Sequence, residues 1–350
     1  MIKKNVAIVG VTGYTGLELV RILSTHPGFA ISAVTSRSLA GQALQEIYPF
    51  FQHTAYGTIP LTIPEPELVS RDSELVFLAV PHGRAMDLAA SFLELGVKVV
   101  DLSADFRIND PGIYFSWYGQ KHSQPGLLAK AAYGIPEIYA REIAPASITA
   151  NPGCYPTSAI LALYPALKNR LIKPRGIIID SKSGTSGAGR TPKTSTLFCE
   201  VTDSFKAYNI GRHRHTPEME QELAKACGED LIISFSPHLV PMNRGILSTC
   251  YAELEKKISE QDIRQAYKRF YRNSPWIRIM PGGKLPETRW VRGTMFCDLG
   301  IVRDERTGRL VVVSCIDNLC RGASGQAVAN ANIMCGFDPQ AGLDHQPVMP

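Results

Sequence analysis

The sequence predicts an α/β protein of two domains, the first built on a parallel sheet and the second an α+β domain with a largely antiparallel sheet. Three observations lead to this fold class. Short apolar runs alternate with helical patterns up to about residue 150, which is typical of a parallel sheet covered on both faces. Later apolar runs follow one another across polar turns, as in GIVRDERTGRLVVV, which indicates hairpins. The chain of 350 residues also exceeds what one core usually holds.

The first domain is expected over residues 1–150, and its elements follow in a regular order. The run NVAIVG predicts a buried strand ending in glycine. Residues 14–25 place their apolar side chains on one stripe, which indicates a helix. A second strand (AISAVTSR), a third (ELVFLAVPHG), a helix over 84–95 and a fourth strand (VKVVDLSADFR) continue the alternation.

The second domain is expected over residues 151–321. A helix is predicted to begin near Pro156 and to run through AILALYPAL. Five strands are predicted after it, namely RGIIIDSKSG, DLIISFSPHLVPM, RGILSTCYAELE, GTMFCDLGIVRD and RLVVVSCIDN. The segment 322–334 has a helical pattern, and we expect a helix over about 322–335 to complete the first domain.

Composition and charge exclude several classes of function. Hydrophobic residues make up 45% and charged residues 20% of the chain, as in a globular protein with a real core. The net charge is +5 and no Lys/Arg run reaches five, so a nucleic-acid partner is not expected, although an anionic small molecule would be attracted. The apolar part of the start MIKKNVAIVGVTG is too short for a signal peptide, and no run approaches a membrane span. We therefore expect a cytoplasmic protein without a membrane partner.

The cysteines predict neither a metal site nor disulfides. The eight stand at positions 154, 199, 227, 250, 297, 315, 320 and 335. None forms a C-x-x-C pair, and no His or Cys cluster has the spacing of zinc ligands. Reduced thiols are the default in the expected compartment.

A glycine turn predicts a dinucleotide site of the Rossmann type. Gly10, Gly13 and Gly16 form G-x-x-G-x-x-G between the first strand and the first helix. Such a turn brings backbone N–H groups and a helix N-terminus against a pyrophosphate. The spacing departs from G-x-G-x-x-G, and a glycine-rich turn that binds nothing is the alternative. The residues expected to contact the cofactor here are Gly10, Thr12, Gly13, Tyr14, Thr15 and Gly16.

The end of the second strand predicts NADP(H) as the cofactor. An NAD site usually has an acidic residue about 20 residues beyond the glycine turn. Here Ser36, Arg37 and Ser38 stand in that place, a cation between two hydroxyls, which suits a 2′-phosphate. The alternative is an ordinary exposed arginine. Pro81 in AVPHG, at the end of the next strand, is also expected beside the cofactor.

The framing of Cys154 predicts a nucleophile. The thiol lies just before the predicted helix, where the helix dipole and unpaired N–H groups lower the pKa of a thiol. Pro152 and Gly153 give a fixed and unobstructed approach, and Pro156 suits a first helical position. A lone cysteine used for packing is the alternative, and five of the other cysteines lie in apolar stretches typical of inert core thiols.

A thiolate nucleophile needs a base, and GRHRHTPEME offers two histidines. His215 lies nearest the predicted helix start and is the first choice for acid–base work. His213 is the second candidate, with positioning as its other role, and both could also belong to a solvated turn. His82 is a further histidine that either reaches the cofactor crevice or lies in a loop.

The segment DSKSGTSGAGRTPK predicts an anion-binding loop. Its glycines would let backbone N–H groups wrap a phosphate, and Lys182 and Arg190 would add charge. It lacks the Walker A order, and a glycine-rich surface loop is the alternative. We assign Ser183, Gly184 and Gly187 to the cofactor, and Arg107, Asn151, Gly189 and Arg190 to the substrate.

Taken together, the motifs resemble one family. GVTGYTGLELVR, DLSADFR, ANPGCYPT, SGTSGAGR, GRHRHTPE and DNLCRGASGQA occur in the order found in the type 1 N-acetyl-γ-glutamyl-phosphate reductases of arginine biosynthesis. The resemblance implies NADPH-dependent reduction of an acyl phosphate to an aldehyde by a homodimer or homotetramer, with 151–321 as the catalytic and dimerisation domain. It also implies that Cys154 is the nucleophile, His215 the acid–base residue and Asn318 a nicotinamide contact.

The predicted chemistry is thiolate attack on the acyl phosphate, loss of phosphate, and hydride reduction of the thioester. Four alternatives stay open at this point. They are aspartate-semialdehyde dehydrogenase, a reductase for carrier-bound aminoadipyl phosphate, a thiol hydrolase without cofactor, and a non-catalytic NADP(H)-binding sensor.

Overall fold

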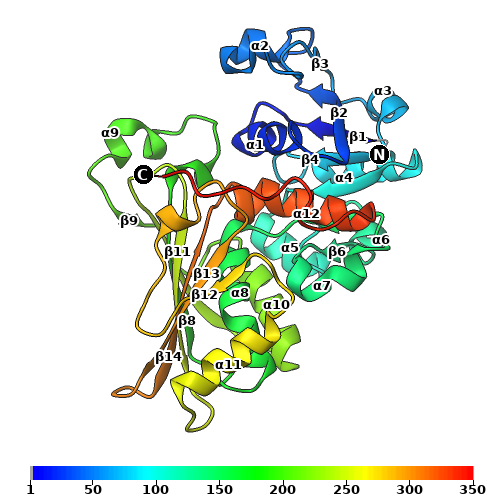
Figure 1. The fold of residues 1–350 in the computed structure, drawn as a ribbon. Helices are drawn as coiled ribbons and strands as arrows, with labels where there is room; N and C mark the ends of the chain where they lie inside the picture. Colours follow the sequence, from blue (N-terminus) through cyan, green and yellow to red (C-terminus); the bar gives the residue numbers. More distant parts are fainter. Residues whose placement is uncertain (1–2, 350) are drawn as a thin grey trace. The chain divides into compact units, whose positions relative to one another are not determined.

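A computed structural model describes residues 3–349 and divides them into two compact units (Figure 1). The first unit comprises the described residues up to Pro152 together with Ala323–Asp344. The second unit comprises Gly153–Gly322 and the residues from His345 onward. Each unit contains one seven-stranded sheet.

All strand pairs in the sheet of the first unit are parallel. The order across the sheet is β3 (Leu61–Thr62), β2 (Phe29–Thr35), β1 (Lys4–Val9), β4 (Leu75–Leu78), β5 (Lys98–Asp101), β7 (Ile148–Ala150) and β6 (Ala132–Tyr133). Continuous apolar runs such as LVFL in β4 form these strands because both faces of the sheet are buried. The carboxyl ends therefore share one edge, where a ligand crevice is expected.

Helices cover this sheet, and the last of them comes from the end of the chain (Figure 1). The longer ones are α1 (Tyr14–Leu23), α4 (Ala85–Glu94), α5 (Pro111–Tyr118), α7 (Pro136–Ile143) and α12 (Gly325–Met334), and the short ones are α2 (Leu44–Ile47), η1 (Pro49–Phe51), α3 (Pro66–Val69), η2 (Ser70–Asp72) and α6 (Pro125–Leu128). A π-helical turn, η6 (Cys320–Ser324), precedes α12. Helix α12 packs on α1, α7 and β5, and Lys98 Nζ donates to the Met334 carbonyl at 2.6 Å.

The sheet of the second unit is mixed and mostly antiparallel. Its order is β12 (Ile277–Ile279), β13 (Cys297–Asp304), β14 (Arg309–Ile316), β11 (Ile246–Glu253), β8 (Ile177–Ser183), β10 (Ile233–Leu239) and β9 (Lys206–Ala207). Only the pairs β8–β10 and β12–β13 are parallel among the described strands of this sheet. The predicted fold class, a parallel-sheet domain with a largely antiparallel α+β domain, is confirmed.

Three helices pack on one face of the second sheet, namely α8 (Cys154–Lys168), α10 (Thr216–Cys227) and α11 (Glu260–Phe270) (Figure 1). Shorter helices in this unit are η3 (Thr185–Ala188), η4 (Thr194–Thr196), α9 (Phe198–Val201) and η5 (Thr288–Trp290). Side chains of β8 alternate between buried and half-exposed, as a strand covered on one face requires. The buried face holds a serine cluster, in which Ser158 Oγ of α8 lies 2.9 Å from Ser248 Oγ and 3.1 Å from Ser314 Oγ.

Helix α8 begins two residues earlier than the sequence predicts, at Cys154 itself. The early start is possible because N–H groups in a first helical turn have no intrahelical acceptor. Pro156, which has no N–H, therefore costs the helix no hydrogen bond at this position. Pro165 lies deeper and leaves the Leu161 carbonyl without its usual partner. Tyr271, the C-cap of α11, donates its Oη–H to that carbonyl at 2.7 Å and so replaces the lost bond.

Candidate active site

Cys154 is the first residue of α8, with Gly153 as its N-cap. The thiol is half-buried, and Thr157 closes the turn by donating to the Gly153 carbonyl from both its N–H and its hydroxyl at 2.9 Å. A helix N-terminus favours an anion, so this position stabilises a thiolate. The environment agrees with the predicted nucleophile, and the role itself stays a prediction.

The other cysteines differ in environment. Cys250, Cys297, Cys315 and Cys320 are buried. Burial raises the pKa of the Cys250 and Cys315 thiols, which keeps them protonated. Cys199 is exposed but lies in the short helix α9.

Gly322 packs directly against Cys154, a contact that sequence reasoning missed. A Cβ at position 322 would lie 2.7 Å from Cys154 Cβ, closer than two such atoms can approach. Glycine is therefore required at position 322 for Cys154 to keep this position. The signal available in the sequence was the glycine in CRGASG, which is far from Cys154 along the chain.

A second missed residue is Glu218 in the first turn of α10. Its Oε1 accepts the N–H of Gly153 at 2.9 Å, and its side chain is only 1% exposed. The bond joins the turn before the nucleophile to the helix that follows the histidines. The glutamate of HRHTPE was the available signal, because a buried acid needs a partner.

The two histidines of HRHT lie together in the second unit. Their ring centroids are 4.8 Å apart, and His215 is the N-cap of α10. His213 Nδ1 accepts the backbone N–H of His215 at 3.1 Å. Burial lowers the pKa of His213 to about 4, with a smaller contribution from Arg214. His213 is thus neutral near pH 7 and fixed as an acceptor, which suits a positioning role.

Two tyrosines connect these histidines to the nucleophile helix. Tyr155 follows Cys154, and its ring meets those of His213 and His215 edge to face at 5.4 and 6.0 Å. Tyr155 Oη lies 2.9 Å from Tyr208 Oη. Burial raises the pKa of Tyr208 to about 12 and raises that of Tyr155 as well, so both stay protonated. Sequence reasoning did not select either tyrosine.

The pKa of His213 yields a test of stability. Its folded-state pKa of about 4 lies below the ordinary histidine pKa of 6.5. The unfolded chain therefore binds the extra proton first as the pH falls, and the folded state loses stability from about pH 6.5 down to about pH 4. His213→Asn keeps an acceptor oxygen near the place of Nδ1 and removes this titration. We expect wild type to lose roughly 2 kcal/mol more than the variant between pH 7 and pH 5.

The measurement is the free energy of unfolding of both proteins in denaturant at each pH. Each unit is followed by a separate probe, because two-unit chains need not unfold in one step. An identical pH dependence in the two proteins would show that His213 is solvated.

The glycine-rich loop is not arranged as predicted. The N–H groups of Gly184, Thr185 and Ser186 donate to the carbonyls of Gly245, Met242 and Asn243 at 2.9, 2.8 and 3.1 Å. The N–H groups of Gly187 and Gly189 donate within the loop. The predicted cradle of backbone N–H groups for phosphate is therefore wrong, because these donors stabilise the loop itself.

The side chains of this loop have different surroundings. Ser183 is buried and donates to the Gly184 carbonyl at 3.0 Å, whereas Gly189 and Arg190 are exposed. Lys182 was expected in the loop but belongs to β8, where it forms an ion pair with Asp180 at 2.8 Å. That expectation was wrong because strand alternation turns Lys182 away from the helix-covered face. Binding of cofactor or substrate by Ser183, Gly184, Gly187, Gly189 and Arg190 stays a prediction.

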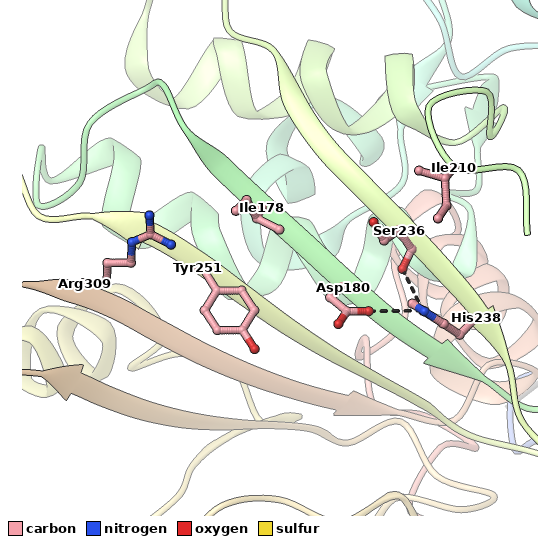
Figure 2. Close-up of a pocket in the computed structure, with 7 residues that line it drawn as sticks. All are labelled: Ile178, Asp180, Ile210, Ser236, His238, Tyr251 and Arg309. Carbon is pink, nitrogen blue, oxygen red and sulfur yellow. Dashed lines mark hydrogen bonds and ion pairs between the residues drawn. The ribbon is translucent and has the colours of Figure 1, made fainter. Parts of the chain in front are cut away.

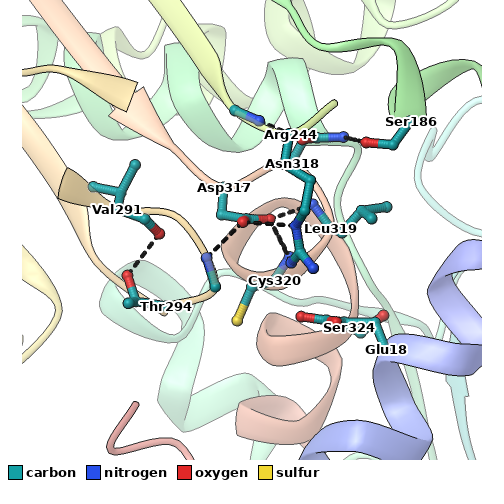
Figure 3. Close-up of polar contacts among 12 residues, drawn as sticks. Glu18, Ser186, Arg244, Val291, Thr294, Asp317, Asn318, Leu319, Cys320 and Ser324 are labelled. Carbon is teal, nitrogen blue, oxygen red and sulfur yellow. Dashed lines mark hydrogen bonds and ion pairs between the residues drawn. The ribbon is translucent and has the colours of Figure 1, made fainter. Parts of the chain in front are cut away.

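Asn318 lies in a polar network next to this loop (Figure 3). Its Oδ1 accepts the N–H of Gly245 at 2.7 Å, and its Nδ2 donates to Ser186 Oγ at 2.9 Å. Neighbouring Asp317 forms a bidentate ion pair with Arg244 at 2.9 Å for both bonds. The amide thus holds the loop in place, and its predicted nicotinamide contact stays a prediction.

The glycine turn of the first unit is closely packed at two of its three glycines. Gly10 has φ +93°, and a Cβ there would lie 2.4 Å from the Ala79 carbonyl oxygen. A Cβ at Gly16 would lie 2.5 Å from the Gly10 carbonyl, so α1 needs glycine to approach the strand. Gly13, the N-cap of α1, has only one atom within 4 Å of such a Cβ. The open side of the turn therefore suits an anionic ligand.

The remaining residues of the turn are held by the first unit around them. The Thr12 carbonyl accepts from Tyr48 Oη at 3.1 Å, and the Thr15 carbonyl accepts from Ser324 Oγ at 2.8 Å. Tyr14 is 38% exposed. Their side chains are predicted cofactor contacts.

Ser36, Arg37 and Ser38 follow β2 at the carboxyl edge of the parallel sheet. Ser36 is buried, while Arg37 and Ser38 are exposed. An exposed cation at this edge is compatible with a 2′-phosphate.

The turn that contains Pro81 lies at the same edge, after β4. The N–H of Arg84 donates to the Pro81 carbonyl at 3.2 Å, and Gly83 N–H donates to Asp105 Oδ1 at 2.7 Å. His82 lies in this turn, and its Nδ1 accepts the N–H of Ala104 at 3.0 Å.

Arg107 and Asn151 are buried in the first unit, with 5% and 1% exposed. Arg107 Nε donates to the Asn151 carbonyl at 2.7 Å. The Asn151 amide donates to Ala323 O at 3.0 Å and accepts from Asn330 at 3.1 Å. These contacts stabilise the end of β7, and the predicted substrate contacts of both residues stay predictions.

The open face of the second sheet has a hollow of about 350 Å³ (Figure 2). Its lining residues are Ile178, Asp180, Ile210, Ser236, His238, Tyr251 and Arg309. His238 Nδ1 lies 3.1 Å from Asp180 Oδ1. Because β8 alternates its side chains, this hollow lies on the face opposite α8 and is separate from Cys154.

The described part of the chain has neither a metal site nor a membrane-spanning helix. Within residues 3–349, no group of three or more His, Cys, Asp or Glu side chains is placed to hold a metal ion. No helix in that range is both long and apolar enough to cross a bilayer.

Comparison with known proteins identifies the family. The model described as semialdehyde dehydrogenase, NAD binding domain, matches residues 5–146, and the model described as semialdehyde dehydrogenase, dimerisation domain, matches residues 154–318. An N-acetyl-γ-glutamyl-phosphate reductase from Pelotomaculum thermopropionicum is 53% identical over 341 residues, covering 97% of each chain. The chain belongs to the N-acetyl-γ-glutamyl-phosphate reductases. A second member, from Desulfotalea psychrophila, is 51% identical and covers 99% of each chain.

Solved structures agree on the fold of this reductase family. Aspartate semialdehyde dehydrogenase II from Vibrio cholerae, in complex with ASA, has a TM-score of 0.73 at 18% identity, covering 96% of this chain and 99% of that one. The Candida albicans enzyme with NADP has a TM-score of 0.72 at 18% identity, covering 95% and 98%. The predicted family resemblance, its reductase activity and its nicotinamide dinucleotide cofactor are confirmed at the level of the family.

Proposed function

We propose that the chain reduces N-acetyl-L-glutamyl 5-phosphate to N-acetyl-L-glutamate 5-semialdehyde with NADPH, through a thioester on Cys154, as a step of L-arginine biosynthesis in the cytoplasm. The observation that carries this proposal is the position of Cys154 at the N-terminus of α8, with Gly153 tied to the helix that begins beside His215. The identity of about half of all residues to reductases with this name supports the substrate.

The first half-reaction is acyl transfer to sulfur. His215 takes the thiol proton, and the Cys154 thiolate attacks the acyl carbon. The tetrahedral oxyanion is stabilised by the N-terminus of α8, where the helix dipole favours an anion. The bond from carbon to the phosphate oxygen then breaks, phosphate leaves with the electron pair, and the thioester remains.

The second half-reaction returns the enzyme to its starting state. The cofactor, when bound, would supply the hydride that reduces the thioester carbon. His215 stabilises the hemithioacetal oxygen by donating its proton and recovers that proton as the carbonyl re-forms. The C–S bond breaks with its electron pair on sulfur, which releases the aldehyde, and the Cys154 thiolate takes back its proton from His215.

The first unit would hold the cofactor. Gly10, Gly13 and Gly16 would place the N-terminus of α1 against the pyrophosphate, and Arg37 would neutralise the 2′-phosphate between Ser36 and Ser38.

Replacing the cation at the edge of the sheet tests the preference for NADPH. Arg37→Ala removes the partner of the 2′-phosphate, so we expect KM for NADPH to rise about 10- to 100-fold, as for loss of a charge-assisted hydrogen bond. KM for NADH should change by less than about 3-fold, because NADH lacks that phosphate. Initial rates with both cofactors give the comparison, and an equal rise for both would contradict the assignment.

The activity is tested in the reverse direction. With NADP⁺ and inorganic phosphate, the purified protein should oxidise N-acetylglutamate semialdehyde, and omission of phosphate should stop the reaction. Aspartate semialdehyde and carrier-bound aminoadipate semialdehyde serve as the competing substrates. A higher kcat/KM for either of them would overturn the substrate assignment, and phosphate-independent turnover would overturn the acyl-phosphate chemistry.

We also propose that the second unit forms a homodimer, or a homotetramer built from it. An apolar arm of Leu197, Phe198, Phe205 and Ile210 is exposed, with 78% of Phe198 and 60% of Phe205 accessible. The arm borders the hollow on the open sheet face, since Phe205 lies 5.3 Å from the His238 ring and Ile210 lines the hollow (Figure 2). The occupant is a second copy, because the matched model of these residues is described as a dimerisation domain.

Polar substitutions in the arm test the assembly. Phe198→Ser combined with Phe205→Ser removes two apolar contacts, so we expect the subunits to dissociate at concentrations at which wild type stays associated. Sedimentation velocity measures the assembly. Phe50→Ser, at a phenylalanine of the first unit that is 70% exposed, is the matched control and should leave the assembly unchanged. A double variant that sediments like wild type would contradict this surface.

A further inference from the structure

We propose that Glu218 is the positioning residue of this active site, and that it acts by accepting the N–H of Gly153. The inference rests on the proposed function of Cys154 as nucleophile and adds a residue that keeps this thiol aligned with its base. Glu218 is not proposed to touch the substrate or to transfer a proton.

The first observation is the bond itself. Glu218 Oε1 accepts the Gly153 N–H at 2.9 Å, across 65 residues of sequence. Only 1% of the glutamate is exposed. A hydrogen bond in a buried place is stronger than one exposed to water, because the low local dielectric screens it less. Gly153 is therefore held more firmly than an ordinary loop residue.

The second observation is where the two ends of this bond lie. Gly153 is the N-cap of α8 and immediately precedes Cys154. Glu218 lies in the first turn of α10, whose N-cap is His215. The next residue, Met219, donates its N–H to the His215 carbonyl at 3.2 Å. Residues three apart on a helix stay in a fixed relation. The Glu218 side chain thus connects the turn that precedes Cys154 to the helix whose N-cap is His215.

The bond also restricts which groups stabilise the oxyanion. The N–H of Gly153 donates to Glu218, so it is not available to the tetrahedral intermediate. Stabilisation of the oxyanion is then left to the rest of the N-terminus of α8, where the helix dipole favours an anion. Without Glu218, Gly153 could turn its N–H elsewhere and shift the first turn of α8. A misplacement of about 1 Å lowers a rate by about 100-fold.

The same helix offers a matched control. Glu220 Oε1 accepts the N–H of Ile233 at 3.1 Å, so it joins α10 to β10 by the same kind of bond. Burial raises the pKa of Glu220, as expected of a partly buried acid. Its partner is remote from Cys154 in sequence and belongs to the sheet. Glu220→Ala therefore measures how far kcat falls when α10 loses a hydrogen bond to the sheet and the bond to Gly153 is kept.

The experiment compares Glu218→Ala, Glu218→Gln and Glu220→Ala in steady-state kinetics with the acyl phosphate and NADPH. For E218A we expect kcat to fall about 100-fold with KM for NADPH within about 3-fold of wild type. E218Q keeps an amide oxygen that accepts the Gly153 N–H, so its kcat should stay within about 10-fold of wild type. E220A should stay within about 3-fold.

Three results would overturn the inference, namely a wild-type kcat in E218A, a kcat of E218Q as low as that of E218A, or an equal loss in E220A. If circular dichroism shows E218A unfolded, Glu218→Asp decides instead. Its carboxylate is one methylene shorter, so kcat should fall at least about 10-fold below that of E218Q, and the reverse order overturns the inference. The proposed function fails separately, if Cys154→Ser stays active.

Discussion

Cys154→Ser is expected to lower turnover of the acyl phosphate by at least about 10⁴-fold, because a serine hydroxyl in this turn is not ionised near pH 7 and loss of a covalent nucleophile costs rates of this size. The substitution changes one atom at the first position of α8. Binding of NADPH should be unchanged, since Cys154 is not among the predicted cofactor residues. Fluorescence titration of NADPH therefore serves as the control for correct folding.

The matching experiment on wild type traps the intermediate. Mixing the protein with acyl phosphate in the absence of NADPH should add one N-acetylglutamyl group to the peptide that contains Cys154, as mass spectrometry would detect. Cys199→Ser, at the exposed cysteine of α9, should acylate and turn over normally. Product formation without any adduct on Cys154 would rule out the thioester route.

His215→Asn is expected to lower kcat by about 10²- to 10⁴-fold, the usual contribution of a general acid–base group. His213→Asn should stay within about 10-fold of wild type, because an asparagine oxygen can still accept the His215 N–H that His213 Nδ1 accepts at 3.1 Å. The difference follows from the pKa of His213, which burial lowers to about 4 and which makes that ring a poor base near pH 7.

The pH dependence of kcat/KM separates the two roles further. In wild type, kcat/KM should fall on the acidic side of the profile, because one group must be deprotonated for activity. This acidic limb should disappear in H215N and remain in H213N. Loss of the limb in H213N instead would exchange the assignments of the two histidines.

The sequence predicted the architecture because the pattern of each strand reflects how many of its faces are buried. The run LVFL in β4 is apolar throughout, as burial on two faces requires, whereas β8 alternates because helices cover only one of its faces. Boundaries were predicted less well where two rules compete. The proline at 156 suggested a helix start, but the first three helical positions tolerate proline equally, so the helix begins at Cys154.

The candidate site was predictable where its residues are neighbours in sequence. NPGC and HRHT each signal their chemistry locally. Glu218 and Gly322 were missed because their significance lies in contacts with Gly153 and Cys154 that only the fold creates. For the glycine-rich loop, the sequence predicted a feature that the fold does not form. Its composition suggests N–H groups available to a ligand, whereas in the structure these N–H groups donate to carbonyls of the same unit.

The course of the chain decides how this protein could be dissected. The first unit is made of two separate stretches, because Ala323–Asp344 belongs with the residues up to Pro152. A gene fragment that stops at position 152 would encode the sheet without α12. A large apolar surface of the sheet would then be exposed to solvent. The two stretches meet where the Asn151 amide donates to Ala323 O at 3.0 Å. A deletion of Gly153–Gly322, with the two ends joined by a short linker, would therefore give a nucleotide-binding domain that folds by itself.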